Sequence, residues 1–206
     1  MNHVFHRVLG DELPIAVRGD GVSIIDRDGK RYIDASGGAA VSCLGHSDVD
    51  VRRAIIEQTQ KLSFAHTAFF TTEVAEELAE NLIAGAPAGL DRVFYVSGGS
   101  EAVEVCLKLA RQYFFEAGEL ERRHIIARRQ SYHGITLGAL SAGGHVWRSE
   151  PFEPMLFQAS HIAPCYSYRE QASQESDEAY GRRAADELET AIQDLGPETV
   201  AAFVAE

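Results

Sequence analysis

The residues with the clearest potential for chemistry are Ser97-Gly98-Gly99-Ser100, which follow the apolar run Val93–Val96. This pattern predicts a strand, a tight turn and the start of a helix. The first backbone N–H groups of a helix have no partner within it, and the helix dipole adds partial positive charge, so such a turn suits a phosphate. Gly98 and Gly99 would let the anion approach the backbone closely. The alternative is an ordinary turn with Ser100 as the N-cap.

Two further groups follow apolar runs. Ser131-Tyr132-His133-Gly134 comes after Ile125–Ala127 and offers an aromatic plane for stacking, a titratable imidazole and a glycine that frees the backbone. A half-buried structural loop is the alternative for this group. Glu206 comes after Val200–Ala205, where a solvated side chain is the simpler interpretation. Ligands of open parallel sheets bind at the carboxyl ends of strands, which is where all three groups are expected.

The hydrophobic pattern around these groups predicts an α/β protein. Two alternating runs, Gly21–Asp26 and Lys30–Asp34, flank an Asp-Gly turn and predict a β-hairpin. Farther on, apolar runs alternate with segments of helical period, which is typical of a parallel sheet with helices on both faces. The expected helices cover residues 48–62, 72–83, 100–117, 136–141 and a segment around Leu188 and Ile192, and the expected strands cover residues 93–96, 125–127 and 199–205.

The helix expected from Ser100 carries small and apolar residues at helical spacing, which predicts a buried stripe. The residues of this stripe are Ala102, Cys106, Leu109, Ala110 and Tyr113.

The composition bounds the class of protein. Nineteen basic and 31 acidic residues in a chain of 206 give a net charge of -12, which argues against a partner such as nucleic acid or a membrane surface. Cys43, Cys106 and Cys165 are widely spaced and predict buried structural thiols, without a disulfide framework or a metal site. No apolar run approaches the ~20 residues of a membrane span, and residues 1–10 lack the apolar stretch of a signal peptide. The expected location is therefore the cytoplasm.

Taken together, the motifs resemble the class III, ω-amino-acid type aminotransferases, which are pyridoxal-phosphate enzymes of fold type I. Order and spacing match over nearly the whole chain. The motifs that carry the resemblance are Asp-Gly-Lys-Arg-Tyr-Ile-Asp at 28–34, Gly45-His46, Ser-Gly-Gly-Ser-Glu-Ala-Val-Glu at 97–104, Lys-Leu-Ala-Arg at 108–111, Tyr132-His133-Gly134 and the final Ala-Phe-Val-Ala-Glu206.

The resemblance implies that Gly98, Gly99 and Ser100 bind the phosphate of pyridoxal 5'-phosphate. Gly98 stands where many members of the family have serine or threonine, so one hydroxyl contact to the phosphate is absent here, whereas the backbone contacts do not need it. The segment after His46 reads Ser-Asp-Val-Asp where the family frequently has histidine and proline, and this departure lies in a region expected to be structural.

For the second group, the resemblance implies that Tyr132 stacks on the pyridine ring of the cofactor and that His133 and Gly134 complete the loop. Glu206 falls where the family has a glutamate at the substrate gate. That glutamate can pair with an arginine from the C-terminal half of the protein when the substrate lacks an α-carboxylate, and this arginine is not in the chain.

The chain is not expected to contain the catalytic residues of the family. A pyridoxal enzyme needs a Schiff-base lysine and an acid, usually aspartate, that keeps the pyridine nitrogen protonated. The resemblance implies that both lie beyond Glu206. Lys30 is in the hairpin, Lys61 is at the end of an exposed helix face, and Lys108 is in the middle of a helix, so none of them is placed to react.

The resemblance also implies the organisation of the chain. Residues 1–46 are expected to form an N-terminal segment with the β-hairpin, as part of a small domain. Residues 47–206 are expected to form the first half of the large, three-layer α/β/α domain, truncated before the catalytic lysine.

The expected activity is the transfer of an amino group between an amine or amino acid and a 2-oxo acid, by a homodimer with its cofactor sites at the subunit interface. Two alternatives stay open. One is another pyridoxal-phosphate reaction on the same scaffold, such as that of an aminomutase, racemase or decarboxylase. The other is a non-catalytic fragment or a phosphate-binding module.

Overall fold

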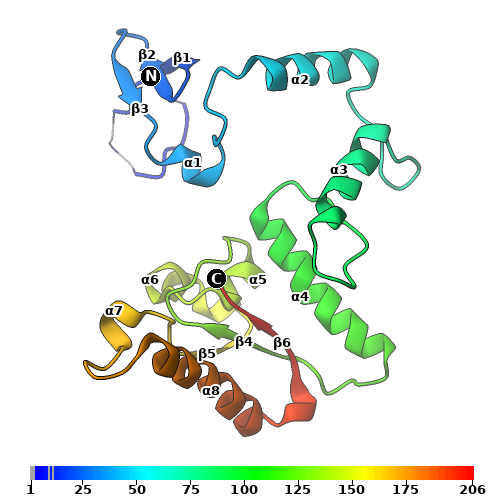
Figure 1. The fold of residues 1–206 in the computed structure, drawn as a ribbon, viewed down its shortest axis with the longest axis vertical. Coiled ribbons are helices and arrows are strands. Elements are labelled where there is room, and N and C mark those ends of the chain that lie inside the picture. The colour runs from blue at the N-terminus through cyan, green and yellow to red at the C-terminus, as the bar shows by residue number, and fades with distance from the viewer. Residues whose placement is uncertain (1–2, 9, 11) are drawn as a thin grey trace. The chain divides into compact units, whose positions relative to one another are not determined.

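The computed structural model describes residues 3–8, 10 and 12–206. The chain divides into two compact units, Met1–Asp91 and Arg92–Glu206. Figure 1 labels the helices and strands of both. The domain division expected after residue 46 stays a prediction, since these units are defined by compactness alone.

The first unit contains a three-stranded antiparallel sheet in the order β1-β2-β3. Strands β2 (Ser23–Asp26) and β3 (Arg31–Ile33) form the predicted hairpin, which is confirmed. Its turn is held by Asp26, whose Oδ1 accepts hydrogen bonds from the N–H groups of Asp28 at 3.0 Å and Lys30 at 2.9 Å. Strand β1 (Ala16–Asp20) was not predicted, because its charged residues and its glycine hide any alternation.

A glycine-rich loop follows the sheet and is fastened by Asp34. Its carboxylate accepts hydrogen bonds from the hydroxyls of Ser36 at 3.1 Å and Ser42 at 2.8 Å, and its Oδ2 lies 2.8 Å from Nε2 of His46. These bonds lower the pKa of Asp34 to about 2, with the Ser42 hydrogen bond the largest cause. The carboxylate therefore joins the start and end of a loop that includes the short turn α1 (Gly37–Ala40).

Two amphipathic helices complete the first unit. Helix α2 (Val49–Lys61) begins after Asp48, whose side chain accepts hydrogen bonds from two N–H groups of the first turn, and helix α3 (Glu73–Ala84) begins after Thr72. Both were predicted to within about two residues. Their apolar faces are only half-covered, and the exposed fraction of Val74, Leu78 and Leu82 is 48–50%.

The second unit contains a three-stranded parallel sheet, with β4 (His124–Arg128) between β5 (Ser160–Ile162) and β6 (Val200–Val204). The helices with at least six residues are α4 (Gly99–Glu116), α5 (Leu137–Ala142) and α8 (Asp177–Leu195). Short helices or turns cover Val146–Ser149 (α6), Glu150–Met155 (η1), Ser167–Glu170 (α7) and Pro197–Thr199 (η2).

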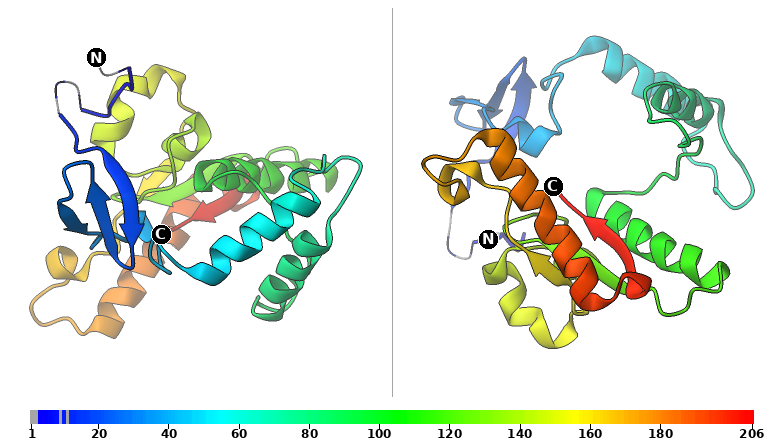
Figure 2. Two further views of the ribbon diagram at one scale, coloured as in Figure 1. Left: turned by 90° about the horizontal axis from the view of Figure 1, so that it is seen from above. Right: turned by 60° about the horizontal axis from the view of Figure 1, so that its bottom comes forward.

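Helices cover both faces of β4. Successive residues of a strand point to opposite faces, and both Ile125 and Ile126 are almost fully buried. Arg128 shares a face with Ile126 and donates a hydrogen bond to the carbonyl of Ala184 in α8 at 3.0 Å. Ile125 faces a cavity that residues of α4 and α5 line. The predicted parallel sheet with helices on both faces is confirmed, and Figure 2 (right) shows α8 in front of the strands.

The strand expected at residues 93–96 is wrong, because this segment pairs with none of the described strands. A strand is defined by hydrogen bonds to a neighbouring strand, and the pairing of the described sheet is limited to β4, β5 and β6. The apolar residues of the segment stay accessible, with Phe94 76% exposed. The segment still leads directly into the turn at Ser97–Ser100.

The predicted buried stripe of α4 is also wrong. Leu107 is its buried residue, whereas Leu109 is 61% exposed and Tyr113 is 66% exposed. Helix α4 is apolar on more than one face, so its periodicity alone did not identify the covered side. The three cysteines are free thiols, as expected, but all are exposed and not buried. Among the described residues, every helix is too short or too polar to cross a lipid bilayer.

We expect the Asp34 carboxylate to make stability depend on pH in the acid range. Because its pKa is lowered to about 2 in the folded chain, the unfolded chain binds more protons below the ordinary value of 3.8. Its stabilising contribution is therefore complete above pH 3.8 and is lost as the pH falls toward 2. Urea unfolding of the wild type and Asp34→Asn between pH 7 and pH 2.5 measures this.

The variant should be less stable at pH 7 and should lose less free energy of unfolding between pH 4 and pH 2.5 than the wild type. Asp28→Asn, in the exposed hairpin turn, is the control for removal of a charge. Equal acid slopes for the wild type and Asp34→Asn would contradict the role of the Asp34 network.

Candidate functional site

The turn before α4 has the properties that an anion-binding turn requires. Gly98 is extended, and α4 begins at Gly99 with no side chain capping it from the Gly98 position. Within the described residues, the N–H groups of Gly99 and Ser100 have no hydrogen-bond acceptor. A Cβ atom added to Gly98 or Gly99 would meet nothing within 4 Å. The glycines therefore leave open space beside unpaired donors at the start of an 18-residue helix.

The preceding residue is fixed so that the turn keeps this shape. Oε2 of Glu101 accepts a hydrogen bond from the N–H of Ser97 at 2.7 Å. This bond resembles one half of a capping box, in which an acid in the first turn reaches back to the N-terminal backbone. Glu101 thereby holds the start of the turn without using the N–H groups of Gly99 and Ser100.

Ser100 joins the turn to the second predicted group. Its Oγ accepts a hydrogen bond from the N–H of Ile135 at 3.0 Å, which leaves the hydroxyl hydrogen available for an anion. Gly134 has φ 130°, a conformation that L side chains rarely adopt, and a Cβ there would lie 2.5 Å from Oγ of Ser100. The close approach of the two segments therefore requires glycine at position 134.

Tyr132 is held in place from two sides. Its N–H donates a hydrogen bond to Oε2 of Glu206 at 2.5 Å, which ties the loop after β4 to the segment after β6. The guanidinium carbon of Arg148 lies 5.2 Å from the centroid of the Tyr132 ring and 4.3 Å from that of Trp147. The Tyr132 residue remains 46% exposed, so part of its ring is free for a ligand.

His133 is a buried side chain with an unsatisfied atom. The residue is 9% exposed, and its Nε2 has no hydrogen-bond partner within the described part of the chain. Burial lowers the pKa of His133, opposed by the charge of Glu206 and assisted by that of His161. A neutral imidazole whose buried Nε2 is unpaired is therefore expected here at neutral pH, and buried unpaired polar atoms of this kind call for a partner.

The three predicted groups lie around the carboxyl ends of the strands, with different degrees of contact. Ser100 contacts the loop at Gly134 and Ile135, and Tyr132 contacts Glu206. A cavity of about 350 Å³ lies beside Glu206. Its lining residues come from the ends of β4, β5 and β6: Arg128, Arg129, Gln130, Ser131, Pro164, Cys165, Tyr166 and Glu206.

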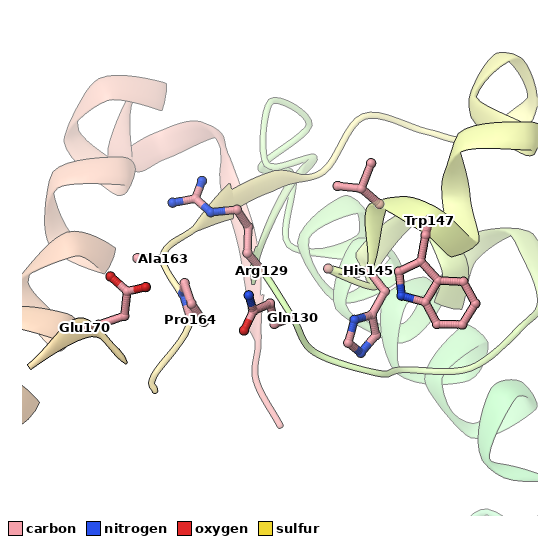
Figure 3. A pocket seen from close by; sticks show the side chains of 9 residues that line it. Arg129, Gln130, His145, Trp147, Ala163, Pro164 and Glu170 are labelled. Carbon is pink, nitrogen blue, oxygen red and sulfur yellow. The ribbon is translucent and has the colours of Figure 1, made fainter. Parts of the chain in front are cut away.

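A larger cavity, of about 640 Å³, lies next to this loop but contains none of the predicted site residues. Figure 3 shows Arg129, Pro164 and Glu170 on one side of it and His145 and Trp147 on the other. The guanidinium of Arg129 donates a hydrogen bond to the carbonyl oxygen of His161 at 3.1 Å. Size alone therefore does not identify the candidate site, which rests on the unpaired N–H groups of Gly99 and Ser100 and on the contact of Ser100 with the loop that carries Tyr132.

The sequence motifs did not assign roles to three residues that shape the site. Arg148 lies beside the Tyr132 ring, the hydroxyl of Thr136 lies 3.4 Å from the carbonyl oxygen of Ser100, and Glu104 reaches from α4 to α5. Each of these side chains contacts a residue more than ten positions away in the sequence. Local patterns do not reveal such partners, although Glu104 does stand at the end of the Ser-Gly-Gly-Ser-Glu-Ala-Val-Glu motif.

Comparison with known proteins places these features in a family. The family model described as Aminotransferase class-III matches residues 8–206. An uncharacterized aminotransferase from Schizosaccharomyces pombe is 45% identical over 206 residues, which are 100% of this chain and 45% of that protein. The chain thus spans about half the length of the curated relatives it matches.

Solved structures agree with the family model. The (S)-enantioselective omega-transaminase from Thermomicrobium roseum matches with a TM-score of 0.90 and 35% identity over 98% of this chain and 46% of that chain. The omega transaminase from Pseudomonas jessenii, in complex with PMP, matches with a TM-score of 0.89 and 34% identity over 94% of this chain and 43% of that chain. The fold is therefore that of fold type I transaminases, and the chain belongs to the class-III aminotransferase family.

Proposed function

We propose that the protein is a pyridoxal-phosphate-dependent aminotransferase, which moves an amino group between an amine or amino acid and a 2-oxo acid. The observation that carries this proposal is the contact between the anion-binding turn at Ser100 and the loop that carries Tyr132. Family membership supports it, because the aligned relatives are aminotransferases. The chain contributes the binding half of the machinery.

The residues present fit pyridoxal 5'-phosphate. Gly98, Gly99 and Ser100 would hold its phosphate, through unpaired N–H groups, a free hydroxyl hydrogen and open space. Tyr132 would hold its ring by stacking, since part of the side chain is exposed beside the turn. When bound, this cofactor supplies an electron sink that stabilises negative charge on the carbon next to the transferred amino group.

The other residues of the loop orient and restrict the site. Glu206 accepts a hydrogen bond from the N–H of Tyr132 and so fixes the backbone of the stacking residue. Its cavity at the strand ends is where we place the gate for the amine or amino acid. His133 is buried and neutral, so it can hold or share a proton at Nε2 without bringing a charge into the site.

We also propose a cytoplasmic homodimer. The described surface of a single chain includes large apolar side chains that a partner subunit could cover, such as Phe69, Phe70 and Phe94, each at least 68% exposed. The three free, exposed thiols fit a reducing compartment.

Transamination is tested directly with the whole gene product that contains this chain. Supplied with pyridoxal phosphate, a set of primary amines and amino acids, and pyruvate, it should form one alanine for each carbonyl product. Chromatography of both products measures the ratio. Racemised donor, or carbon dioxide released without alanine, would contradict aminotransfer and favour another reaction of the cofactor.

Replacement of Ser100 by aspartate should remove the cofactor. The new carboxylate would stand where the phosphate is expected, and repulsion between two anions should weaken binding of pyridoxal phosphate by at least about tenfold. Equilibrium dialysis against pyridoxal phosphate measures it. Ser173→Asp adds the same charge at an exposed position and serves as the control. Unchanged affinity in Ser100→Asp would overturn the phosphate assignment.

Measurement of the molecular mass in solution tests the proposed homodimer. Light scattering on the eluting peak of the whole gene product should give twice the mass of one subunit at micromolar concentration. A mass of one subunit across that range, with the cofactor retained, would show that the site does not need a second subunit.

A further inference from the structure

We propose that Glu104 is a positioning residue that fixes the distance between the phosphate-binding turn and the stacking loop. The inference rests on the proposed function, because it concerns how the two ends of one cofactor are held at the same time. It assigns no contact between Glu104 and the cofactor. The role is to connect α4, which begins at the turn, to α5, which follows the loop.

The carboxylate of Glu104 caps the neighbouring helix. Its Oε1 accepts hydrogen bonds from the N–H groups of Gly138 at 2.7 Å and Ala139 at 3.3 Å, which belong to the first turn of α5. Such N–H groups are normally satisfied by the helix's own N-cap side chain. Thr136 occupies the N-cap position of α5 and makes no such hydrogen bond. A residue from α4 therefore performs the capping.

The Thr136 side chain is turned toward α4. Its Oγ1 lies 3.4 Å from the carbonyl oxygen of Ser100, and its hydrogen bond to Glu104 is the largest cause of the lowered pKa of that acid. The lowered pKa means that Glu104 is ionised at neutral pH, as a strong acceptor for backbone N–H groups requires. Desolvation opposes this effect and does not overcome it.

Glycine at position 138 lets the Glu104 carboxylate come close to the backbone of α5. A Cβ atom on Gly138 would lie 2.5 Å from one carboxylate oxygen of Glu104 and 2.6 Å from the other. Four residues earlier, in the loop, a Cβ on Gly134 would lie 2.5 Å from Oγ and 2.8 Å from Cα of Ser100. Glycines thus permit the following segment to approach α4 closely at two positions one helical turn apart, Ser100 and Glu104, and a hydrogen bond is made at each position.

Two hydrogen-bonded contacts with α4, at Ser100 and at Glu104, fix the orientation of the loop relative to that helix, whereas one contact would fix only a distance. The hydrogen bond of Ile135 to Ser100 joins the loop after β4 to the first turn of α4 at one point. The bonds from α5 to Glu104 add a second point on the same helix, so the loop is oriented relative to the turn, while Glu206 holds the Tyr132 backbone from the end of β6. Binding of the ring then follows binding of the phosphate at a high effective concentration.

The test separates positioning from a general structural role. Glu104→Ala should lower the affinity for pyridoxal phosphate at least about tenfold, while the affinities for inorganic phosphate and for phosphate-free pyridoxal change by less than about twofold. Glu104→Gln keeps one carbonyl acceptor and should restore part of the loss. Equilibrium dialysis with the three probes measures the affinities, and visible circular dichroism of the bound cofactor reports its orientation.

The outcomes are distinguishable. Glu116→Ala, near the other end of the same helix, should bind all three probes like the wild type. Equal losses for all three probes in Glu104→Ala and Glu104→Gln, or unchanged affinity for pyridoxal phosphate, would overturn the positioning role and leave the proposed function intact. Failure of the wild type itself to bind pyridoxal phosphate would overturn the proposed function instead. If Glu104→Ala does not fold, Glu104→Gln decides, through its dichroism and its phosphate affinity.

Discussion

The candidate site depends on the contact between Ser100 and the loop that carries Tyr132. These segments lie more than 30 residues apart, and one N–H···O hydrogen bond and one glycine bring them together. Any other residue at position 134 would place its Cβ against Ser100 and would need an unfavourable backbone φ. The unpaired N–H groups of Gly99 and Ser100 therefore lie beside the loop that carries the aromatic ring, and the absence of a side chain at Gly134 permits this approach. Neither group would be a cofactor site alone, since a helix start and a half-exposed tyrosine are common features of soluble proteins.

Rigid elements fix the loop on its remaining sides. Strand β4 is buried on both faces, and Arg128 at its end donates hydrogen bonds to the carbonyls of Ala163 and Ala184. Glu206 fixes the Tyr132 backbone from the end of β6, and Arg148 lies beside its ring. The loop is thus ordered before any ligand arrives, which reduces the entropy lost on binding. Such a site can therefore have its binding residues in position even though the chain is expected to contain no catalytic lysine.

The sequence predicted the fold class, the hairpin and most helices, because period and turn residues are local properties. The motifs also located the two segments that meet where Ser100 contacts Gly134 and Ile135. The strand expected at residues 93–96 is absent because a strand needs a neighbour, and the apolar run does not say whether one is present. Strand β5 was missed because Ser160-His161-Ile162 is short and begins with polar residues. The covered face of α4 was predicted wrongly because this helix is apolar on more than one side.

Glu104 shows most clearly why part of the site could not be predicted. In the sequence, it is an acid four residues before Lys108, the spacing of an ordinary solvent-exposed ion pair along a helix. Its actual partners are backbone N–H groups 34 and 35 residues later, and no property of α4 indicates them. A local trace lies in α5, where glycine stands in the first turn and the N-cap threonine makes no cap hydrogen bond of its own. The Glu104 carboxylate caps α5 beside that glycine, where a Cβ would lie within 2.6 Å of both of its oxygens. The contact is therefore a property of the folded pair of helices and not of either sequence segment.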